Sequence, residues 1–493
     1  MIVKRFTKIT AVVAFFAACG CGNALASGPY QTTGIKIGEV TDDSAIVWTR
    51  LTRDPQRVGA EAPMPEVRYR DPKTGALRDK PVGGRADSKP VVTFPANSTI
   101  ETIEGAVPGA PGKVRVLYKA AAASDWKNTD WRPVDPKRDY TCQFRLKDLQ
   151  PDTRYQVRVE ATGEAEAVEG QSVEGVFRTP PRADEPARVV FTVVTGQAYP
   201  DRDAPDGFKI YPVMLKLDPD FFVHTGDILY YDALAKTEAL ARWHWASMYS
   251  LPTNVEFHRQ VASYFIKDDH DTLMDDCWPG MQTSFMGDFT FEQGQAIFLE
   301  QVPMGGRTWR TFHWGKDLQI WLVEGRDFRS PNTMGDGPDK TIWGREQKAW
   351  FKKTVEESDA TFRILISPTP IVGPDRKNKH DNHSNVNFQH EGDEIRGFIG
   401  GQKNVYVICG DRHWQYVSVD KETGVREYSC GPASDKHAGG WTNDMRFPEH
   451  KYLNVIGGFL AVIVDRSEGK PTLTFRHYSV DGRILNEDHL AAQ

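Results

Sequence analysis

FFVHTGDILYYD, residues 221–232, joins an apolar strand to a turn that carries a carboxylate. Gly226 allows the backbone to turn sharply, so Asp227 projects from the carboxyl edge of the sheet, where open α/β sheets bind ligands. A single Gly-Asp pair is a common turn. However, FIKDDHD (265–271) and VYVICGDRHW (405–414) also end apolar runs in Asp and His. Three such strand ends together predict one shared metal site.

The residues at these strand ends suit a two-metal centre for the hydrolysis of phosphate esters. Two cations held close together activate the attacking oxygen and neutralise the developing charge, and an anionic oxygen has to bridge them. We predict that Asp227 is this bridge and that Asp269 and Asp411 bind the same ion or the second one. His413 suits a transition metal, and Tyr230 offers a phenolate to a ferric ion.

Basic side chains near these clusters are candidates for handling the substrate. His270 is placed to donate a proton to the substrate or leaving group, and the alternative is a structural, hydrogen-bonded histidine. Arg326 offers a guanidinium that matches phosphate oxygens, unless it is buried against Glu324 or Asp327. For Arg329 we expect the structural role. Two further polar segments either line the cleft or form solvated loops, the commoner role: DNHSN (381–385) and DKH (435–437).

Residues 28–180 are predicted to form an all-β domain. The domain begins with a strand, a polar turn and a second strand. Further along, a turn followed by a tyrosine lies between two alternating strands: Leu149, Pro151, Asp152 and Tyr155. This arrangement resembles a fibronectin type III sandwich, whose tyrosine hydrogen-bonds back across the corner.

A Pro-rich, charged linker at 179–189 leads into residues 186–493, where strands alternate with helices. Apolar strands such as RVVFTVVTG (188–196) are followed by amphipathic helices such as REQKAWFKKTVEES (345–358). The tail from 457 to 482 has the pattern of antiparallel strands. This order predicts sheets packed face to face with helices outside them.

The first 26 residues are predicted to be an export signal. A basic start, an apolar stretch and a small-residue cleavage site follow one another: Lys4, Arg5 and Lys8, then Ile9 to Ala18, then Ala24-Leu25-Ala26. The stretch is shorter than the ~20 apolar residues of a membrane span, so no transmembrane span is predicted. Cys19 and Cys21 leave lipid attachment as a second option. The mature chain is expected to be periplasmic or secreted.

The net charge and the cysteine content limit which partners and which redox environment are expected for the chain. A net charge of −6 gives no electrostatic reason to expect a nucleic-acid backbone or an anionic membrane as partner. Four cysteines follow the signal, and export would place them in an oxidising space. Cys409 and Cys430 end nearby apolar segments and could form a disulfide. The predicted partners are therefore phosphate esters, either small molecules or polymers.

Four motifs together resemble those of the PhoD-like (alkaline phosphatase D) family of metallophosphoesterases. In that family Gly-Asp-x-x-Tyr, Asp-Asp-His-Asp/Glu and Gly-Asp-x-His occur in this order. The matching segments here are Gly226 to Tyr230, Asp268 to Asp271 and Gly410 to His413. The fourth element is an acidic residue and two arginines before a Gly-x-x-Gln-x-x-Trp helix start: Glu324, Arg326 and Arg329, then Gly344, Gln347 and Trp350.

The resemblance covers nearly all of the mature chain and implies both a fold and an activity. The implied fold is an α/β, four-layer αββα metallophosphoesterase core with an N-terminal fibronectin type III-like domain. The implied site holds Fe³⁺ and Ca²⁺ and hydrolyses phosphomonoesters, phosphodiesters or both. By motif position, Asp227 would bridge the two ions. Tyr230 and His413 would bind iron, and Asp269 and Asp411 would bind calcium. His270 would match the family's catalytic histidine.

One departure from the family pattern concerns the iron ligands. The family's first strand commonly ends Ser-Cys-Gln, with the Cys thiolate binding iron, whereas this chain reads Thr195-Gly196-Gln197. Glycine has no side-chain donor, so the iron site either has one donor fewer or is completed by another group. The identity of the metal at this site therefore stays open. Thr195, Gln197, the distant Cys277, water or substrate are the candidate replacements. Asp275 and Asp276 also occupy positions where family members often carry Asn.

Three functions are compatible with these observations. The leading hypothesis is an exported, metal-dependent alkaline phosphatase or phosphodiesterase. A second is a specialised diesterase of phospholipase D type, or one that acts on nucleotides or teichoic-type polymers. A third is a non-catalytic surface-binding protein whose metal site has degraded, although the other retained ligands argue against it.

Overall fold

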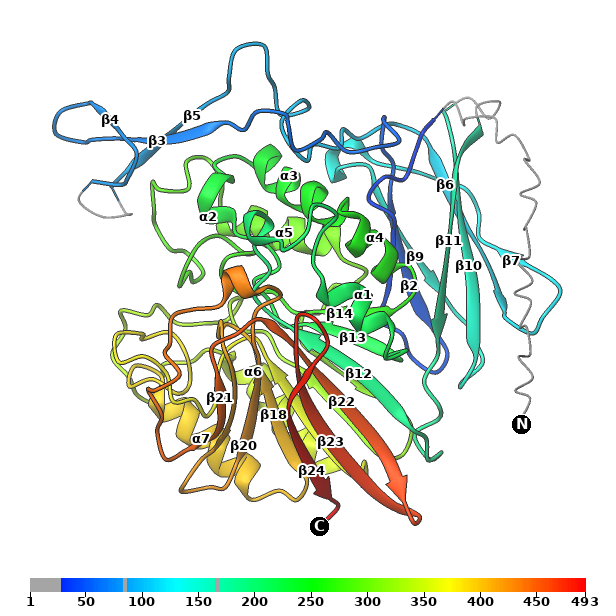
Figure 1. Cartoon of the computed structure of the whole chain (residues 1–493), viewed down its shortest axis with the longest axis vertical. Coiled ribbons are helices and arrows are strands. Elements are labelled where there is room, and N and C mark those ends of the chain that lie inside the picture. Colours follow the sequence, from blue (N-terminus) through cyan, green and yellow to red (C-terminus); the bar gives the residue numbers. More distant parts are fainter. Residues whose placement is uncertain (1–27, 83–86, 165–168) are drawn as a thin grey trace, which may run out of the picture.

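The structure is a computed structural model that describes residues 28–82, 87–164 and 169–493. The predicted export signal lies outside the described residues. Across the described ranges, no helix combines the length and the apolar character needed to cross a membrane. A β-rich N-terminal part lies beside a larger part in which helices flank two sheets (Figure 1).

The first large sheet has nine strands in the described part of the chain. In spatial order they are β24 (Ile484–Ala491), β23 (Lys470–Ser479), β22 (Gly458–Ser467), β12 (Val189–Val194), β13 (Phe221–His224), β14 (Ala262–Phe265), β1 (Ile35–Gly38), β2 (Ala45–Arg50) and β9 (Thr141–Leu146). The strands β12, β13 and β14 are parallel neighbours, so their carboxyl ends lie side by side. The tail strands β22 and β23 are antiparallel, as predicted for residues 457–482, and β24 adds a further antiparallel strand.

The second large sheet has seven strands in the described residues. Their spatial order is β15 (Arg310–His313), β16 (Leu318–Leu322), β17 (Phe362–Ser367), β18 (Val405–Cys409), β20 (Arg426–Cys430), β19 (Gln415–Val419) and β21 (His450–Asn454). The strands β16, β17, β18 and β20 are parallel. Cys409 and Cys430 end two of them, but both thiols are free, so the disulfide suggested by their positions is not formed.

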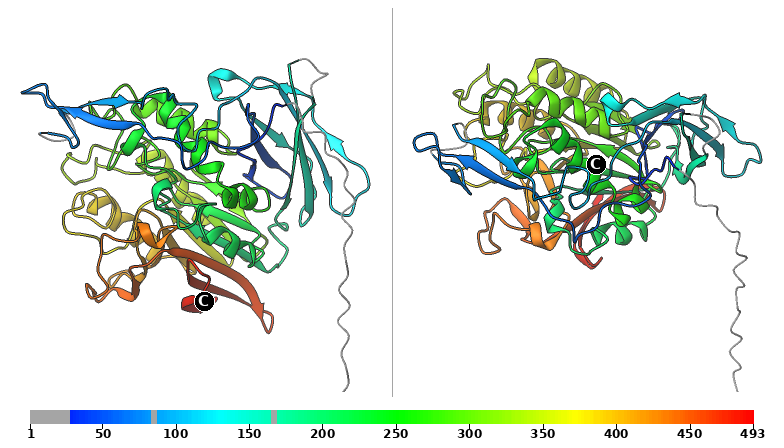
Figure 2. Two further views of the ribbon diagram at one scale, coloured as in Figure 1. Left: turned by 45° about the horizontal axis from the view of Figure 1, so that its top comes forward. Right: turned by 90° about the horizontal axis from the view of Figure 1, so that it is seen from above.

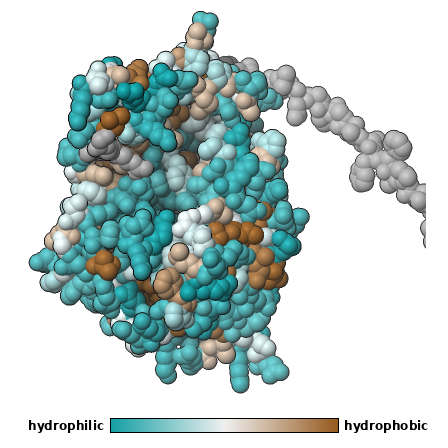
Figure 3. Space-filling model, turned by 60° about the vertical axis from the view of Figure 1, so that its left-hand side comes forward, coloured by the Kyte–Doolittle hydropathy of each residue, from teal (hydrophilic) through white to brown (hydrophobic). Residues whose placement is uncertain are grey.

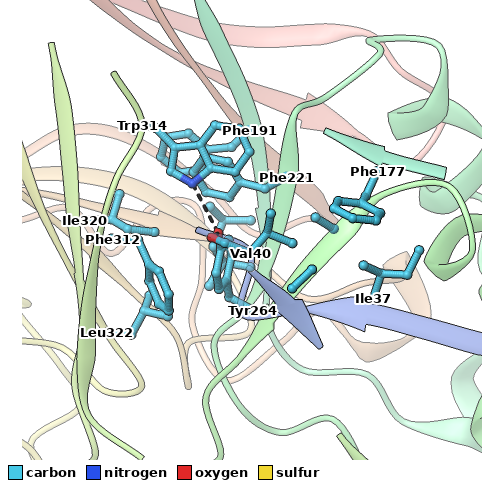
Figure 4. Close-up of a cluster of buried hydrophobic side chains, with 14 of the residues drawn as sticks. Ile37, Val40, Phe177, Phe191, Phe221, Tyr264, Phe312, Trp314, Ile320 and Leu322 are labelled. Atoms are coloured by element: carbon cyan, nitrogen blue, oxygen red, sulfur yellow. Dashed lines mark hydrogen bonds between the residues drawn. The ribbon is translucent and has the colours of Figure 1, made fainter. Parts of the chain in front are cut away.

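The two large sheets pack face to face through an aromatic and aliphatic core (Figure 4). Along β13, Phe221 and Val223 point into this core, whereas Phe222 points to the opposite face. Side chains alternate along a strand, and every residue of β13 is buried because both faces of the sheet are covered. Trp314 stacks on Phe221 at 4.6 Å and donates a 3.2 Å hydrogen bond to the Tyr264 hydroxyl.

Helices cover the outer face of each large sheet. The outer face of the first sheet packs against α1 (Ile210–Leu215), α2 (Tyr231–Leu234), α3 (Glu238–Tyr249), α4 (Pro252–His258) and α5 (Phe291–Gln301). The second sheet packs against α6 (Gly344–Glu357) and α7 (Gln389–Gly400). The core therefore has the predicted αββα layers, with two sheets face to face and helices outside them.

The N-terminal β sandwich shares a sheet with this core. Its outer sheet has the order β11 (Glu169–Arg178), β10 (Arg154–Thr162), β6 (Lys113–Ala120) and β7 (Lys127–Asn128), with β8 (Arg132–Pro133) also on β6. Its inner sheet is β1, β2 and β9, and β1 pairs with β14 of the core. The Tyr155 hydroxyl accepts a 2.8 Å hydrogen bond from the Gln150 N–H across the corner, as the fibronectin-like pattern predicted.

A small sheet reaches from the sandwich over the helical layer. It consists of β4 (Leu77–Arg78), β3 (Glu66–Arg70) and β5 (Lys89–Thr93). In Figures 1 and 2 these strands lie at the opposite side of the helical layer from the sandwich. Tyr69 of β3 stacks on Phe285 of the core at 5.2 Å. This N-terminal excursion therefore helps to build the surroundings of α2 and α3.

Candidate metal centre

The carboxyl ends of the two sheets bring the predicted clusters together. Asp227 follows β13, Asp269 and His270 follow β14, and His413 follows β18 of the other sheet. A short parallel bridge between Thr195 and Pro432 joins the sheets at this edge. The core packing therefore sets the distances between residues that are far apart in sequence.

Both Gly-Asp turns depend on glycine and on an unusual backbone conformation. A Cβ atom on Gly226 would lie 2.6 Å from Asp268 Cβ, and one on Gly410 would lie 2.6 Å from Thr225 Oγ1. The aspartates that follow have φ angles of 53° at Asp227 and 61° at Asp411. Non-glycine residues in this left-handed region are uncommon and concentrate at functional sites.

Four donor groups converge around the hydroxyl of Tyr230. The Tyr230 oxygen lies 3.4 Å from Asp227 Oδ2, 3.0 Å from His413 Nε2 and 2.6 Å from His437 Nε2. His413 Nε2 is 3.8 Å from the same carboxylate oxygen of Asp227. Ligand atoms on a cation with bonds near 2 Å are separated by roughly 3 Å. These spacings therefore fit a single bound ion.

A second group of carboxylates meets at Asp227. Asp227 belongs to two sets of ligand atoms that lie within 4.8 Å of one another, one with Asp269 and His270 and the other with Asp268 and Asp411. Carboxylate oxygens are the preferred ligands of hard cations such as Ca²⁺. The position of Asp227 between the two groups fits the predicted bridge.

The electrostatics of this cluster also fit a cation. Asp227 is 1% exposed, and its Oδ1 has no hydrogen-bond partner among the described residues. Burial and the neighbouring carboxylates raise the pKa of Asp227 well above its ordinary value. Burial likewise raises the pKa of Tyr230 and lowers the pKa of His413. A bound cation would lower the pKa values of Asp227 and Tyr230 again, because it stabilises deprotonated ligands.

Beside Asp269, Lys379 compensates for the two aspartates that replace Asn of the family pattern. Its ammonium lies 2.8 Å from Asp276 and 3.3 Å from Asp275. The N–H of Asp276 donates a 2.6 Å hydrogen bond to Asp269 Oδ2. The additional negative charge is therefore matched by a cationic side chain within the same cluster.

His270 is held by a carboxylate that sequence reasoning did not single out. Its Nδ1 lies 2.6 Å from Asp232 Oδ1, and its ring lies 4.4 Å from that of Tyr230. Burial would lower the pKa of His270, but the charges of Asp232, Asp269 and Asp227 outweigh it and raise the pKa well above its usual value. These charges favour the protonated imidazole beside the candidate metal ligands.

Arg326 lies behind the carboxylates. Its Nε donates a 2.5 Å hydrogen bond to Asp268, its Nη2 lies 3.6 Å from Asp269 Oδ2, and the residue is 0% exposed. Glu324, a partner considered from the sequence, instead binds Lys267 at 2.9 Å. The Gln347 side chain fixes Glu324 by hydrogen bonds to its backbone N–H and C=O. Contact between Arg326 and a substrate stays a prediction.

The polar loop at 381–385 is part of the buried interior. The backbone carbonyl of Asp381 accepts a hydrogen bond from the buried guanidinium of Arg329, which agrees with the structural role expected for this arginine. His383 is buried and pairs with Glu391 at 2.9 Å. The solvated-loop interpretation of this segment is therefore wrong, because Asp381, Asn382, His383 and Asn385 are buried.

The second polar loop, Asp435 to His437, reaches the metal centre. His437 lies in the donor cluster, and sequence reasoning placed its segment only at the cleft or in solvent. No regular strand or helix positions it, because it belongs to a short 3-10 turn. The one sequence signal was the polar density of the segment.

The layers are those of the metallophosphoesterase fold, and this ring of carboxylates and imidazoles lies at the carboxyl ends of its two sheets. Family models of the PhoD-like phosphatase match residues 191–446, and those of its N-terminal domain match residues 18–181. The chain belongs to the PhoD-like phosphatase family.

Two solved structures share this fold over most of the chain. A structure of PhoD is 16% identical, with a TM-score of 0.69, and the match covers 94% of this chain and 89% of that one. A purple acid phosphatase from yellow lupin (Lupinus luteus) seeds is 15% identical, with a TM-score of 0.56, over 93% of this chain and 74% of that one. A comparison with curated protein sequences finds no match.

Proposed function

We propose that the chain is an exported, metal-dependent phosphohydrolase that cleaves phosphate mono- or diesters at a two-metal centre. The observation that carries this proposal is the convergence of Asp227, Tyr230 and His413 on one point. The proposed ions are Fe³⁺ beside Tyr230 and His413, and Ca²⁺ beside Asp269 and Asp411, with Asp227 shared between them. Bound cations would lower the pKa of a water molecule and neutralise charge on the phosphoryl group.

The protein's own groups have distinct parts in this proposal. Asp227 projects from its left-handed turn and keeps its carboxylate at a fixed position between the two donor groups. His270 is oriented by Asp232 and donates a proton to the oxygen of the departing alcohol. Arg326 holds Asp268 and Asp269 in place through buried ion pairs and thus positions the second group.

Metal removal tests the proposed function directly. The purified full-length chain is expected to hydrolyse a nitrophenyl phosphate monoester, the matching diester or both. Incubation with a chelator, followed by its removal, is expected to abolish this hydrolysis, and added iron and calcium to restore it. A colorimetric release assay measures both steps. Hydrolysis that is indifferent to the chelator would count against a metal-dependent mechanism.

A cavity beside the donor cluster favours diesters with an apolar alcohol as a second, narrower candidate. It has a volume of about 420 Å³, and Tyr230 and His437 form part of its wall. The rest of the wall exposes mostly apolar surface and includes Met64, Leu229, Leu234, Trp243 and Met248. The ion pair between Arg202 and Glu104 also lines it, and Met64 and Glu104 come from the N-terminal domain. Cavities of this size and composition hold small apolar groups.

The mostly hydrophilic face in Figure 3 carries its hydrophobic side chains in small, separate groups.

Filling this cavity is expected to change substrate preference. Ala233 lines the cavity and is exposed, so Ala233→Phe places a ring inside it. We expect kcat/KM for an octyl nitrophenyl phosphate to fall by about ten- to a hundredfold, because hydrophobic pockets discriminate on this scale. The methyl ester should lose much less. Ala239→Phe, an exposed position on α3 outside this cavity, is the matched control. Equal losses for both esters would refute the assignment of the cavity.

A further inference from the structure

The backbone at Gly196 faces the donor cluster. A Cβ atom built on Gly196 would lie 3.2 Å from His413 Cδ2 and 3.3 Å from His437 Cδ2. Such contacts are tighter than ordinary van der Waals separation. The imidazole of His437 therefore already fills the space into which a side chain at position 196 would extend.

The three replacements suggested by the sequence have other partners. The Thr195 hydroxyl donates to the carbonyl of Gly226 at 3.2 Å. The Gln197 amide binds the Tyr211 hydroxyl at 2.7 Å and the Met248 sulfur at 2.9 Å. Cys277 is buried, and its sulfur lies 3.6 Å from the backbone carbonyl of Asp269.

His437 has the geometry of a metal ligand. Its Nε2 is 2.6 Å from the Tyr230 hydroxyl, and its ring centre is 4.2 Å from that of His413. Its other nitrogen, Nδ1, lies 2.7 Å from Asp201 Oδ2. A proton on Nδ1 shared with a carboxylate leaves the Nε2 lone pair free, which is the usual support of a ligating histidine.

The turn that carries His437 is anchored on both sides. The Ser434 hydroxyl donates to the carbonyl of Asp201 at 2.7 Å, and the Gly457 N–H donates to Asp435 Oδ1 at 3.0 Å. The Ser434 contact thus ties the turn to the segment after β12 that contains Gly196. The imidazole is held at the cluster by the same segment that lacks the side-chain donor.

We propose that His437 supplies the donor that a cysteine at position 196 supplies in the family pattern, and that Asp201 positions it. The assignment rests on the proposed function, because it concerns the ion beside Tyr230 and His413. Its donor set is then two imidazoles, one phenolate and one carboxylate. These donors suit iron or zinc, and exchanging a thiolate for a neutral imidazole makes the set less negative by one charge.

Iron retention in the full-length chain tests this assignment without relying on activity. His437→Ala is expected to lose iron to a competing chelator at least about tenfold more readily than the wild type. Calcium content should stay unchanged, because the second group of carboxylates is intact. Elemental analysis measures both ions, and visible absorption from the Tyr230–iron contact reports the first site alone. Added imidazole should restore iron to the cavity left by the alanine.

Control variants separate a lost donor from a disturbed fold. Lys436→Ala changes an exposed neighbour in the same turn and should retain iron like the wild type. Asp201→Asn should weaken iron retention by about tenfold, and His437→Ala with Gly196→Cys should recover iron with a new thiolate absorption. A His437→Ala chain that retains iron and its Tyr230 absorption overturns the assignment alone. A wild-type chain that binds neither iron nor zinc overturns the proposed function together with it.

Discussion

Asp227→Asn is expected to lower kcat at least about a thousandfold for every phosphate ester tested. The variant should also lose bound metal. The carboxylate lies in both donor groups, so its replacement by a neutral amide weakens both sites at once. Cations in such sites contribute several kcal/mol to transition-state stabilisation, and each 1.36 kcal/mol is a factor of ten in rate. Activity assays and elemental analysis on the same preparation check both parts.

The matched control for this variant is Asp218→Asn. Asp218 has a φ of 47°, close to the 53° of Asp227, but its side chain lies at the surface beside Arg154. Asparagine is tolerated in left-handed backbone, so both variants should fold alike, and only Asp227→Asn should lose metal. If Asp227→Asn kept its metal and its rate, the shared-carboxylate model would be wrong.

The positions of Asp227 and Asp269 at one edge of the first large sheet, and of Asp411 at the end of β18 in the second, could be predicted from the sequence because parallel strands have a simple geometry. Each residue follows an apolar run, and strands that run in one direction end at the same edge of a sheet. The covered faces also explain why β13 shows no polar alternation. The αββα layers follow from the same strand and helix order.

The parts of the site that sequence reasoning missed depend on contacts between irregular segments. His437 is placed by Asp201, which lies in a different loop, and no periodic pattern connects the two. Asp232 occupies the first turn of α2, where an acidic residue has the ordinary role of stabilising the helix start. Its contact with His270 becomes visible only when β13 and β14 lie side by side.

Arg326 and Arg329 are both buried, which favours structural roles for them. A short sequence motif gives little information on burial. Arg326 and Asp268 are both fully buried and paired, and an unpaired charge at that depth would be costly. The motif that contains Arg326 therefore shapes the scaffold under Asp269. The Gln347 contacts with the Glu324 backbone extend the same scaffold to α6.

The second large effect is expected for His270, and it should depend on the leaving group. His270→Asn should lower kcat for alkyl phosphate esters by about a hundredfold to ten-thousandfold, the range of general acid catalysis. Nitrophenyl esters should be much less affected, because nitrophenolate departs without a proton. The metal held at the Tyr230 cluster should stay at the wild-type level, since that cluster does not include His270. A series of esters with leaving groups of graded basicity measures this dependence.

Asp232 should share this dependence in weaker form, because it acts through the imidazole that it orients. Asp232→Asn is expected to steepen the same leaving-group plot by a smaller amount while metal is retained, and exposed His390→Asn on α7 should leave the plot unchanged. A uniform loss across all leaving groups in His270→Asn would instead assign the imidazole to binding the phosphoryl group. The slope of the plot thus distinguishes proton donation from charge stabilisation, two roles that the 2.6 Å contact with Asp232 supports equally well.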